Sequence, residues 1–378
     1  MAYYFIFPEK DSTLYSHQNR EKTNTGHDEI IELAKEKGTT NQVYYPTRVL
    51  VKFRDSELKS TISDITGDTF SCSVQLMSSE HKNLKSTQNL ELFAISQSWD
   101  EGTGRYTNLP TSSDGTSWVY RDNDTAKTKW TTSSFAVNTT GSINASGITE
   151  GGGTWYTGTG FESTQQFLNA ENLDTDLDVT SIVQKYSASL FASQTYPDGI
   201  PNDGFIVKLT NAIETDTSAS NGALKYFAVE THTIYSPKLV FKWDDSSHTY
   251  QPSASLSGGL HVSLYGNKKE YNDDEVAKFK IQVRDLYPTR TFTTSSNFLT
   301  HNYFTTSSFY SVRDAQTEEE IIPFDENYTK LSADAGGMYF KLHMKGLQPE
   351  RNYRVLFKHN NNDGTIVYDN SYHFKVVR

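Results

Sequence analysis

The chain has 378 residues, which is too long for one ordinary domain and suggests two or three. Its 35% hydrophobic and 21% charged residues exclude a disordered or membrane composition, and its 13% aromatic content is typical of pleated β-structure. The formal net charge of -11 argues against nucleic acid as a partner, because phosphate binding requires clustered lysine and arginine.

A β-strand is expected to begin almost at the N-terminus, in the apolar run from Tyr3 to Phe7. No basic segment precedes this run and no small-residue cleavage site follows it, so we do not expect a signal peptide. No stretch approaches the roughly 18 apolar residues of a transmembrane helix, so we expect no membrane insertion. Synthesis in a cytoplasm follows as an expectation.

Residues 28–37 fit two kinds of element. Good helix formers and charges favour a helix, but the isoleucines and Leu33 fit the edge of a sheet equally well. The periodicity of so short a run does not distinguish a helix from a strand. Strands are predicted at residues 49–53 and 90–95. Between them lies Cys72, the single cysteine, which we expect to be a small buried residue without a disulfide partner in the chain.

A long insertion is expected at residues 103–161, which are rich in Thr, Ser, Gly and Asn. Loops of this length in a compact domain are usually functional or disordered. Three tryptophans are spaced through the segment: Trp118, Trp130 and Trp155. They indicate that parts of the insertion pack onto the domain.

A helix is predicted at residues 179–191, with Asp178 as its N-cap. Four apolar side chains fall on one face of it: Ile182, Val183, Tyr186 and Leu190. Further strands are predicted at residues 204–209, 226–230 and 238–243.

A polar run after Trp243 and a Ser-, Gly- and Pro-rich stretch indicate a linker. We therefore expect a first domain at residues 1–245, a linker at 246–259 and a second domain at 260–378. The second domain has predicted strands at residues 277–283, 338–342, 353–358 and 372–377. Their clean alternation predicts that one face of each strand is buried. Many short strands separated by polar clusters predict an all-β fold.

Five short motifs occur in a fixed order in the first domain. They are Asp11 with Asn24-Thr25-Gly26, Arg48-Val49-Leu50-Val51-Lys52-Phe53, Ser98-Trp99-Asp100-Glu101-Gly102, Asp178-Val179-Thr180, and Ser236-Pro237-Lys238-Leu239. In these motifs the domain resembles the DNRLRE or disaggregatase-related modules, which are similar to carbohydrate-binding jelly rolls. The resemblance covers residues 11–243 and implies an N-terminal jelly-roll β-sandwich. The insertion at 103–161 is much larger than the resemblance implies, so the resemblance does not establish a ligand cleft in this chain.

The second domain carries a corner motif, Gly346-Leu347-Gln348-Pro349-Glu350-Arg351-Asn352-Tyr353. It resembles the Gly-Leu-x-Pro-x-x-x-Tyr corner of fibronectin-type domains, in which the tyrosine hydroxyl, here that of Tyr353, pins the loop. The resemblance implies an immunoglobulin-like or fibronectin-like β-sandwich, as is common in virion proteins. The whole chain also looks like proteins of tailed phages of marine bacteria.

No residue pattern indicates catalysis. The adjacent carboxylates Asp100 and Glu101 point to opposite faces if they lie on a strand, so they do not form the pair that a glycosidase requires. The histidines have no zinc spacing, and the sequence has no nucleophile elbow and no phosphate-binding loop. We expect a protein that is not an enzyme.

Jelly rolls of this resemblance can hold a structural calcium ion, and no other cofactor is expected. Calcium requires six to eight oxygen ligands. The first candidate ligands are Asp174, Asp176 and Asp178, and a second set is Asp11, Glu101, Asp122 and Asp124.

Exposed aromatic residues of the insertion form the candidate contact surface: Trp118, Trp130, Trp155 and Tyr156. They can stack on sugars, contact a neighbouring subunit, or anchor the loop on the sandwich. Loop anchoring is the interpretation that we prefer from the sequence.

The favoured function is a phage virion structural protein of the tail, baseplate, neck or another external part of the particle. Its partners would be copies of itself and other virion proteins, and its location the virion, after synthesis in the host cytoplasm. Symmetric assembly predicts a homo-oligomer. The alternative is a host-recognition protein that binds surface glycans through the first jelly roll. A shallow aromatic cleft with a polar rim would favour the alternative, and a large apolar patch the virion part.

Overall fold

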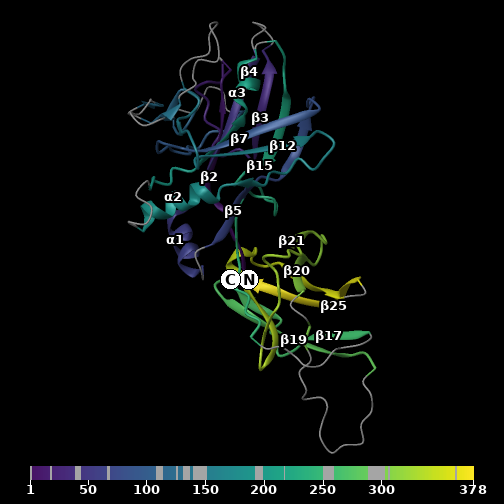
Figure 1. Ribbon diagram of the computed structural model, residues 1–378. Helices are drawn as coiled ribbons and strands as arrows, with labels where there is room; N and C mark the ends of the chain where they lie inside the picture. Colours follow the sequence, from purple (N-terminus) through teal and green to yellow (C-terminus); the bar gives the residue numbers. More distant parts are fainter. Residues whose placement is uncertain are drawn as a thin grey trace, which may run out of the picture. The chain divides into compact units, whose positions relative to one another are not determined.

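The computed structural model describes residues 2–17, 19–38, 44–65, 69–107, 114–124, 127–130, 137–138, 151–191, 199–216, 218–249, 259–287, 303–304, 307–361 and 364–378. Strands predominate, as Figure 1 shows, and the predicted all-β sandwich architecture is confirmed. The chain forms two compact units. The N-terminal unit comprises Ile6–Asp64 and Ser71–Val240, and the C-terminal unit comprises Met1–Phe5, Ile65–Phe70 and Phe241–Arg378.

Most strands of the N-terminal unit belong to one antiparallel sheet, in the order β12-β7-β14-β4-β3-β15-β6, with β2 paired to β4. Its strands are β2 (Pro8–Tyr15), β3 (Ile30–Lys37), β4 (Tyr44–Phe53), β6 (Ser78–Lys82), β7 (Thr87–Ala94), β12 (Glu162–Leu168), β14 (Phe205–Leu209) and β15 (Gly222–Phe227). Shorter strands are β8 (Tyr120–Asp122), β9 (Thr128–Lys129), β10 (Val137–Asn138), β11 (Trp155–Tyr156) and β13 (Leu177–Asp178). Three strands have residues in both units: β1 (Ala2–Ile6), β5 (Phe70–Gln75) and β16 (Lys238–Trp243).

The strands predicted at residues 49–53 and 90–95 are confirmed as β4 and β7. Residues 28–37, for which helix and strand were both open, form β3 from Ile30. Its Leu33 faces Leu224 of β15 and both side chains are buried, so the sheet takes this segment despite its good helix formers. Cys72 on β5 is buried, as predicted.

Two later predictions about strands have different outcomes. The strand expected at residues 226–230 begins earlier, at Gly222, and ends at Phe227. It ends there because the chain turns away after Ala228, whose N–H donates to the carbonyl of Glu29. Residues 238–243 form β16 as predicted.

Three helices complete the N-terminal unit: α1 (Asp55–Asp64), α2 (Thr180–Leu190) and α3 (Asn211–Thr215). Helix α2 is the predicted one, and Tyr186 on its buried face donates from its hydroxyl to the carbonyl of Gly204 at 2.7 Å. The N-cap is Val179 and not Asp178, whose carboxylate instead accepts from the N–H of Thr180 at 2.9 Å. Helix α1 lies beside α2 (Figure 1). In the described part of the chain, no helix is long and apolar enough to cross a membrane.

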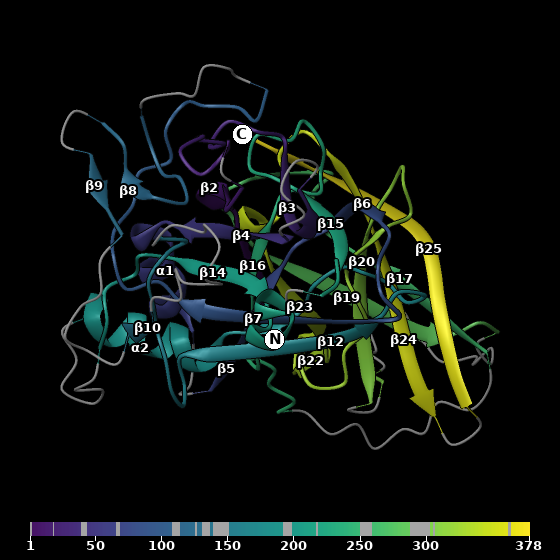
Figure 2. The same ribbon diagram turned by 90° about the horizontal axis from the view of Figure 1, so that it is seen from above.

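The C-terminal unit is a sandwich of two sheets, ordered β17-β19-β23-β22 and β18-β25-β24-β20-β21. Its strands are β17 (Leu260–Leu264), β18 (Glu270–Asn272), β19 (Val276–Asp285), β20 (Ser308–Asp314), β21 (Glu320–Ile322), β22 (Ser332–Asp334), β23 (Gly337–His343), β24 (Asn352–Asn361) and β25 (Gly364–Val377). The predicted strands are confirmed as β19, β23, β24 and β25. A short 3-10 helix, η2 (Met344–Gly346), follows β23. Strands β24 and β25 form a long hairpin, which Figure 2 shows.

Aromatic rings fill the space between these two sheets. Phe279 of β19 stacks on Phe340 of β23, with ring centroids 4.9 Å apart, and Phe340 stacks on Tyr310 of β20 at 4.3 Å. At the corner before β24, the hydroxyl of Tyr353 donates to the carbonyl of Gln348 at 3.0 Å. This bond closes the loop in the way that the corner motif implies.

The first residues of the chain pack within the C-terminal unit. The hydroxyl of Tyr3 donates to Oδ2 of Asp325 at 3.2 Å, and the ring of Tyr4 lies edge-on to His343. The strand expected at the N-terminus is therefore present as β1, although the sequence placed it with the first domain. The boundaries expected at residues 245 and 260 stay predictions, and residues 250–258 of the expected linker lie outside the described residues.

Candidate functional site

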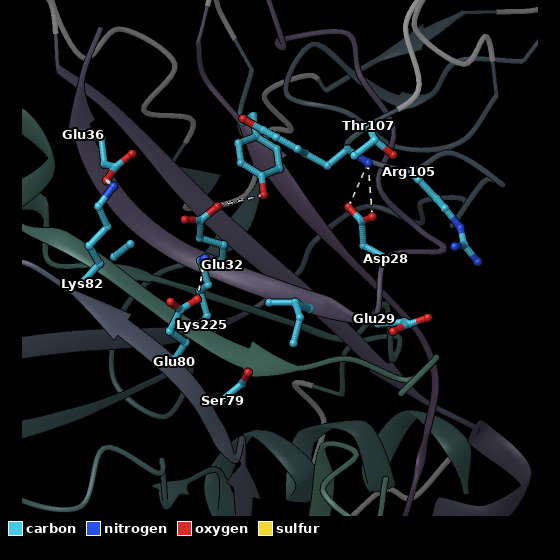
Figure 3. Close-up of a pocket in the computed structure, with 14 residues that line it drawn as sticks. Asp28, Glu29, Glu32, Glu36, Ser79, Glu80, Lys82, Arg105, Thr107 and Lys225 are labelled. Carbon is cyan, nitrogen blue, oxygen red and sulfur yellow. Dashed lines mark hydrogen bonds and ion pairs between the residues drawn. The ribbon is translucent and has the colours of Figure 1, made fainter. Parts of the chain in front are cut away.

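A polar groove runs along β3 in the N-terminal unit, with a volume of about 580 Å³ (Figure 3). We call it the β3 groove. Its walls come from the end of β2, from β3, β6 and β15, and from residues 105–107. Five carboxylates and three basic side chains line it: Asp28, Glu29, Glu32, Glu36 and Glu80, with Lys82, Arg105 and Lys225.

The alternation of β3 explains why these side chains meet. Successive residues of a strand point to opposite faces, so Ile31 and Leu33 enter the core while Glu32 faces the groove. Lys225 lies on β15, and the strand registers pair it with Glu32 of β3 on one side and with Glu80 of β6 on the other. The sheet therefore places a cation between two carboxylates at the floor of the groove.

These floor residues form ion pairs and hydrogen bonds with one another. Lys225 lies 2.8 Å from Oε2 of Glu80, and the hydroxyl of Tyr15 donates to Glu32 at 3.1 Å (Figure 3). The hydrogen bond with Glu80 raises the pKa of Lys225 and lowers that of Glu80. Burial raises the pKa of Glu32, against the opposing effect of the Tyr15 hydrogen bond.

Two aromatic rings, those of Tyr15 and Tyr106, lie together in the lining of the groove. The rings of Tyr15 and Tyr106 have centroids 4.9 Å apart, and the guanidinium of Arg20 lies over the Tyr106 ring at 4.0 Å. Tyr106 is 41% exposed, so part of its ring is open to solvent. Its N–H donates to both carboxylate oxygens of Asp28, at 3.0 and 3.2 Å, which fixes this loop to the start of β3.

A second hollow of about 440 Å³ continues from these two rings. It shares Tyr15, Glu32, Glu36 and Tyr106 with the β3 groove, and its far side is formed by residues that include His17 and Tyr45. Their rings lie 4.5 Å apart between centroids. The two hollows together form an elongated site with aromatic rings near its centre and charged groups along its length.

The tryptophans of the insertion lie elsewhere, inside the N-terminal unit. Trp118, Trp130 and Trp155 belong to one buried cluster with exposures of 0%, 6% and 2%, so their rings are closed to a sugar in this conformation. Trp118 and Trp155 enclose the guanidinium of Arg48, which lies 4.7 and 5.1 Å from their ring centroids. Tyr156 is half-buried and stacks on Phe161. These buried rings anchor the described parts of the insertion on the N-terminal unit.

The chain passes over Trp118 through three consecutive glycines. Gly152 has φ +81°, and a Cβ there would lie 2.5 Å from a guanidinium nitrogen of Arg48. Its carbonyl accepts from Arg48 at 2.7 Å. Only glycine combines this backbone conformation with so close an approach.

The aspartates considered as calcium ligands accept hydrogen bonds within the N-terminal unit, and the calcium site stays a prediction. Asp174 accepts from the N–H of Ser78 at 2.6 Å, Asp176 from the amide of Gln75 at 3.2 Å, and Asp178 from Thr180. Among the described residues, one group of three His, Cys, Asp or Glu side chains places ligand atoms within 4.8 Å of one another: His27, Glu101 and Glu230. Of these, Glu101 was in the second calcium set.

Most residues of the β3 groove were not singled out in the sequence. They come from five separate segments, which are brought together by the pairing of β3, β6 and β15 and by the contacts of Tyr106 with Asp28 and Tyr15. The alternation of residues 30–33 was the available signal, because an outward-facing Glu32 between two buried residues marks the exposed face of this strand.

Comparisons with known proteins assign neither a family nor a function to the chain. No family model matches the chain, and no curated protein matches it. A DUF4785 family protein from Legionella pneumophila aligns with 98% of this chain and 65% of its own, at 8% identity and a TM-score of 0.18. The β-glucuronidase of Parabacteroides merdae aligns with 96% of this chain and 36% of its own, at 9% identity and a TM-score of 0.15. At these TM-scores neither similarity carries an argument about fold or function.

Proposed function

We propose that this protein is a non-enzymatic recognition protein that binds carbohydrate in the β3 groove of its N-terminal unit. The observation that carries the proposal is the partly exposed ring of Tyr106 above a floor of hydrogen-bonding carboxylates and cations. A sugar presents C–H faces that stack on aromatic rings and hydroxyls that bond to charged side chains. The volume of about 580 Å³ lies in the range of small-molecule sites.

The charges of the groove favour a neutral or amino sugar. Its five carboxylates exceed its three basic side chains, so a uronate or sulfated sugar would meet net repulsion. Glu32, Glu36 and Glu80 have partners within the groove, in Tyr15, Lys82 and Lys225 respectively. Carboxylates held in this way position a ligand, which supports binding without hydrolysis.

A glycan array with the purified chain tests this proposal, followed by titration of the bound sugar against Tyr106→Ala. Loss of the stacking ring is expected to weaken binding about tenfold or more, as for removal of an aromatic anchor. Tyr287→Ala is the matched control, because Tyr287 is an 87% exposed tyrosine of the C-terminal unit. An array without any hit, or equal affinity in the Tyr106 variant, would contradict the proposal. Chromatography of the incubated sugar checks that it is not cleaved.

We propose the phage virion structural protein as the second candidate function, with copies of the chain or other virion proteins as partners. It is supported by the edge of β25. In the described structure, β18 pairs with β25 at residues 375–377, while residues 364–367 are exposed, with Ile366 at 41% and Val367 at 50%. An exposed strand edge with apolar side chains is a template for pairing with another chain.

Native mass spectrometry tests this second candidate. A symmetric oligomer that dissociates in Val367→Lys, and persists in Val276→Lys, would support assembly through β25. Val276 is a suitable control because it is a 52% exposed valine on β19 of the other sheet. A monomer at all concentrations would count against assembly through this edge.

A further inference from the structure

Three loops of the N-terminal unit bring His27, Glu101 and Glu230 together. His27 lies between β2 and β3, Glu101 follows β7, and Glu230 follows β15. One ligand atom from each lies within 4.8 Å of the others. Atoms at such separations can bind one ion after small rotations of the side chains.

The backbone of these loops is fixed by neutral hydrogen bonds. The Asn24 side-chain amide donates to the carbonyls of Glu101 at 2.6 Å and Thr116 at 2.8 Å. Its oxygen accepts from the N–H of Gly26 at 3.2 Å and of Gly104 at 2.7 Å. The N–H of His27 also donates to the carbonyl of Gly104 at 3.0 Å. The backbones of His27 and Glu101 are therefore held together by contacts that do not involve the side chains of these two residues.

A third carboxylate belongs to Asp11. The backbone N–H of Asp11 donates to Oε1 of Glu101 at 3.1 Å, and Oδ2 of Asp11 accepts from the N–H of Val229, the neighbour of Glu230. The Asp11 side chain is fully buried, yet its Oδ1 has no hydrogen-bond partner in the described structure. Oε2 of Glu230 is also inaccessible and unpartnered there. Buried polar atoms almost always have hydrogen-bond partners, and a bound group can supply one to these two oxygens.

The charge of the cluster points to a cation as that partner. Asp11, Glu101 and Glu230 bring three carboxylates together beside the imidazole of His27. A bound cation would offset the repulsion among three closely placed carboxylates.

We propose that Asp11, His27, Glu101 and Glu230 form a binding site for one divalent transition-metal ion, zinc or manganese. The imidazole decides the class of ion, because calcium and magnesium take oxygen ligands whereas imidazole suits first-row transition metals. Three carboxylates complete a set of hard oxygen donors that both zinc and manganese accept. The site is independent of carbohydrate binding in the β3 groove.

Isothermal titration of the chelator-treated chain with Zn²⁺ and with Mn²⁺ tests the proposal, with Ca²⁺ titrated in parallel. We expect one Zn²⁺ or Mn²⁺ per chain, and a melting temperature that rises by roughly 5 °C or more at about a hundredfold excess over Kd. His27→Gln and Glu230→Gln are each expected to weaken binding by about a hundredfold. His232→Gln and Glu162→Gln are matched controls, since both residues are exposed in the same unit.

The melting temperature of Glu230→Gln also distinguishes a metal ligand from a residue that only stabilises the fold. It removes a charge from the repelling cluster, so the metal-free variant is expected to melt at or above the temperature of the metal-free parent while losing the metal-induced rise. Failure of both Zn²⁺ and Mn²⁺ to bind would overturn the proposal. So would unchanged affinity in both the His27 and Glu230 variants, or binding of Ca²⁺ alone.

Discussion

The guanidinium of Arg48 donates to both carboxylate oxygens of Glu214, at 3.2 and 2.8 Å, and neither side chain is exposed. Two tryptophan rings flank the guanidinium, and Lys208 lies 3.6 Å from the same carboxylate. A charge buried in this way requires its partner, because its hydration has been removed. The pair thus links β4, the insertion and α3 in the core of the N-terminal unit.

Removing one member of this pair should be strongly destabilising. Arg48→Met is expected to lower the free energy of unfolding by about 3–5 kcal/mol, since Glu214 loses its bidentate partner and keeps the longer contact with Lys208. The double variant Arg48→Met, Glu214→Leu should recover part of the loss because neither charge is left alone. Denaturant unfolding of the single and double variants measures this. Glu36→Gln, which breaks the exposed pair with Lys82, should change the free energy by less than about 1 kcal/mol.

Gly26 should not tolerate a side chain. A Cβ at this position would lie 2.3 Å from the carbonyl oxygen of Glu101, which belongs to a loop that Asn24 holds in place. Gly26→Ala is expected to cost about 1–3 kcal/mol of stability through overpacking. Thermal unfolding compares it with Gly259→Ala, where the nearest atom would be 3.7 Å away. Equal melting temperatures for the two variants would show that the Glu101 loop can move aside.

The hydroxyl of Tyr353 is expected to stabilise the C-terminal unit through its bond to Gln348. Tyr353→Phe removes that donor and keeps the ring, so it should cost about 1 kcal/mol. Tyr339→Phe serves as a control on a half-buried tyrosine of β23 in the same unit. Chemical unfolding followed by aromatic fluorescence measures both. A Tyr353 variant as stable as the parent would mean that the corner closes without its hydrogen bond.

His359 should make the C-terminal unit less stable in mild acid. Its ring is 6% exposed and stacks on Phe304 with centroids 4.5 Å apart, and its Nδ1 lies 3.1 Å from the hydroxyl of Ser308. Burial lowers its pKa, so the unfolded chain takes up a proton at a higher pH than the folded chain. The contribution to stability is therefore complete above about pH 6.5 and is lost as the pH falls toward the lowered folded value.

Melting temperatures of the parent and of His359→Gln between pH 7.5 and 5 check this expectation. The parent should lose stability over that interval by more than the variant does. His373→Gln is the control, because His373 is an exposed histidine on β25. Parallel curves for the parent and the His359 variant would refute a role for this ring in the acid response.

The sequence predicted the fold well because strand alternation is a local property. In β19, for example, buried residues alternate with more exposed ones, and this local pattern alone predicts a strand. β3 was ambiguous because its helix formers and its apolar residues pointed to different elements, and pairing with β15 decided between them. Helix α1 was missed since only Leu58 and Thr61 of it are buried, which leaves little apolar periodicity.

The candidate sites depend on contacts that no local pattern contains. Asp174, Asp176 and Asp178 are close in sequence, but the first two bond to Ser78 and Gln75 while Asp178 bonds to Thr180 in its own segment. Asp11 and Glu230 are far apart in sequence and meet because β2 and the turn after β15 are neighbours in the fold. The motif residues Asn24 and Arg48 were recognised by resemblance, and the structure adds what each does: one fixes loops, and the other fills the core.

The four hydrogen bonds of the Asn24 amide have a consequence for how this protein can change. They fix the course of the Glu101–Gly104 backbone through the carbonyl of Glu101 and the N–H of Gly104. The next residues, Arg105 to Thr107, project into the β3 groove from that fixed base. New side chains can therefore be tried at these three positions while the loop keeps its path. This wall of the groove therefore combines exchangeable side chains with a fixed backbone, which suits it to selection for new ligands in the laboratory.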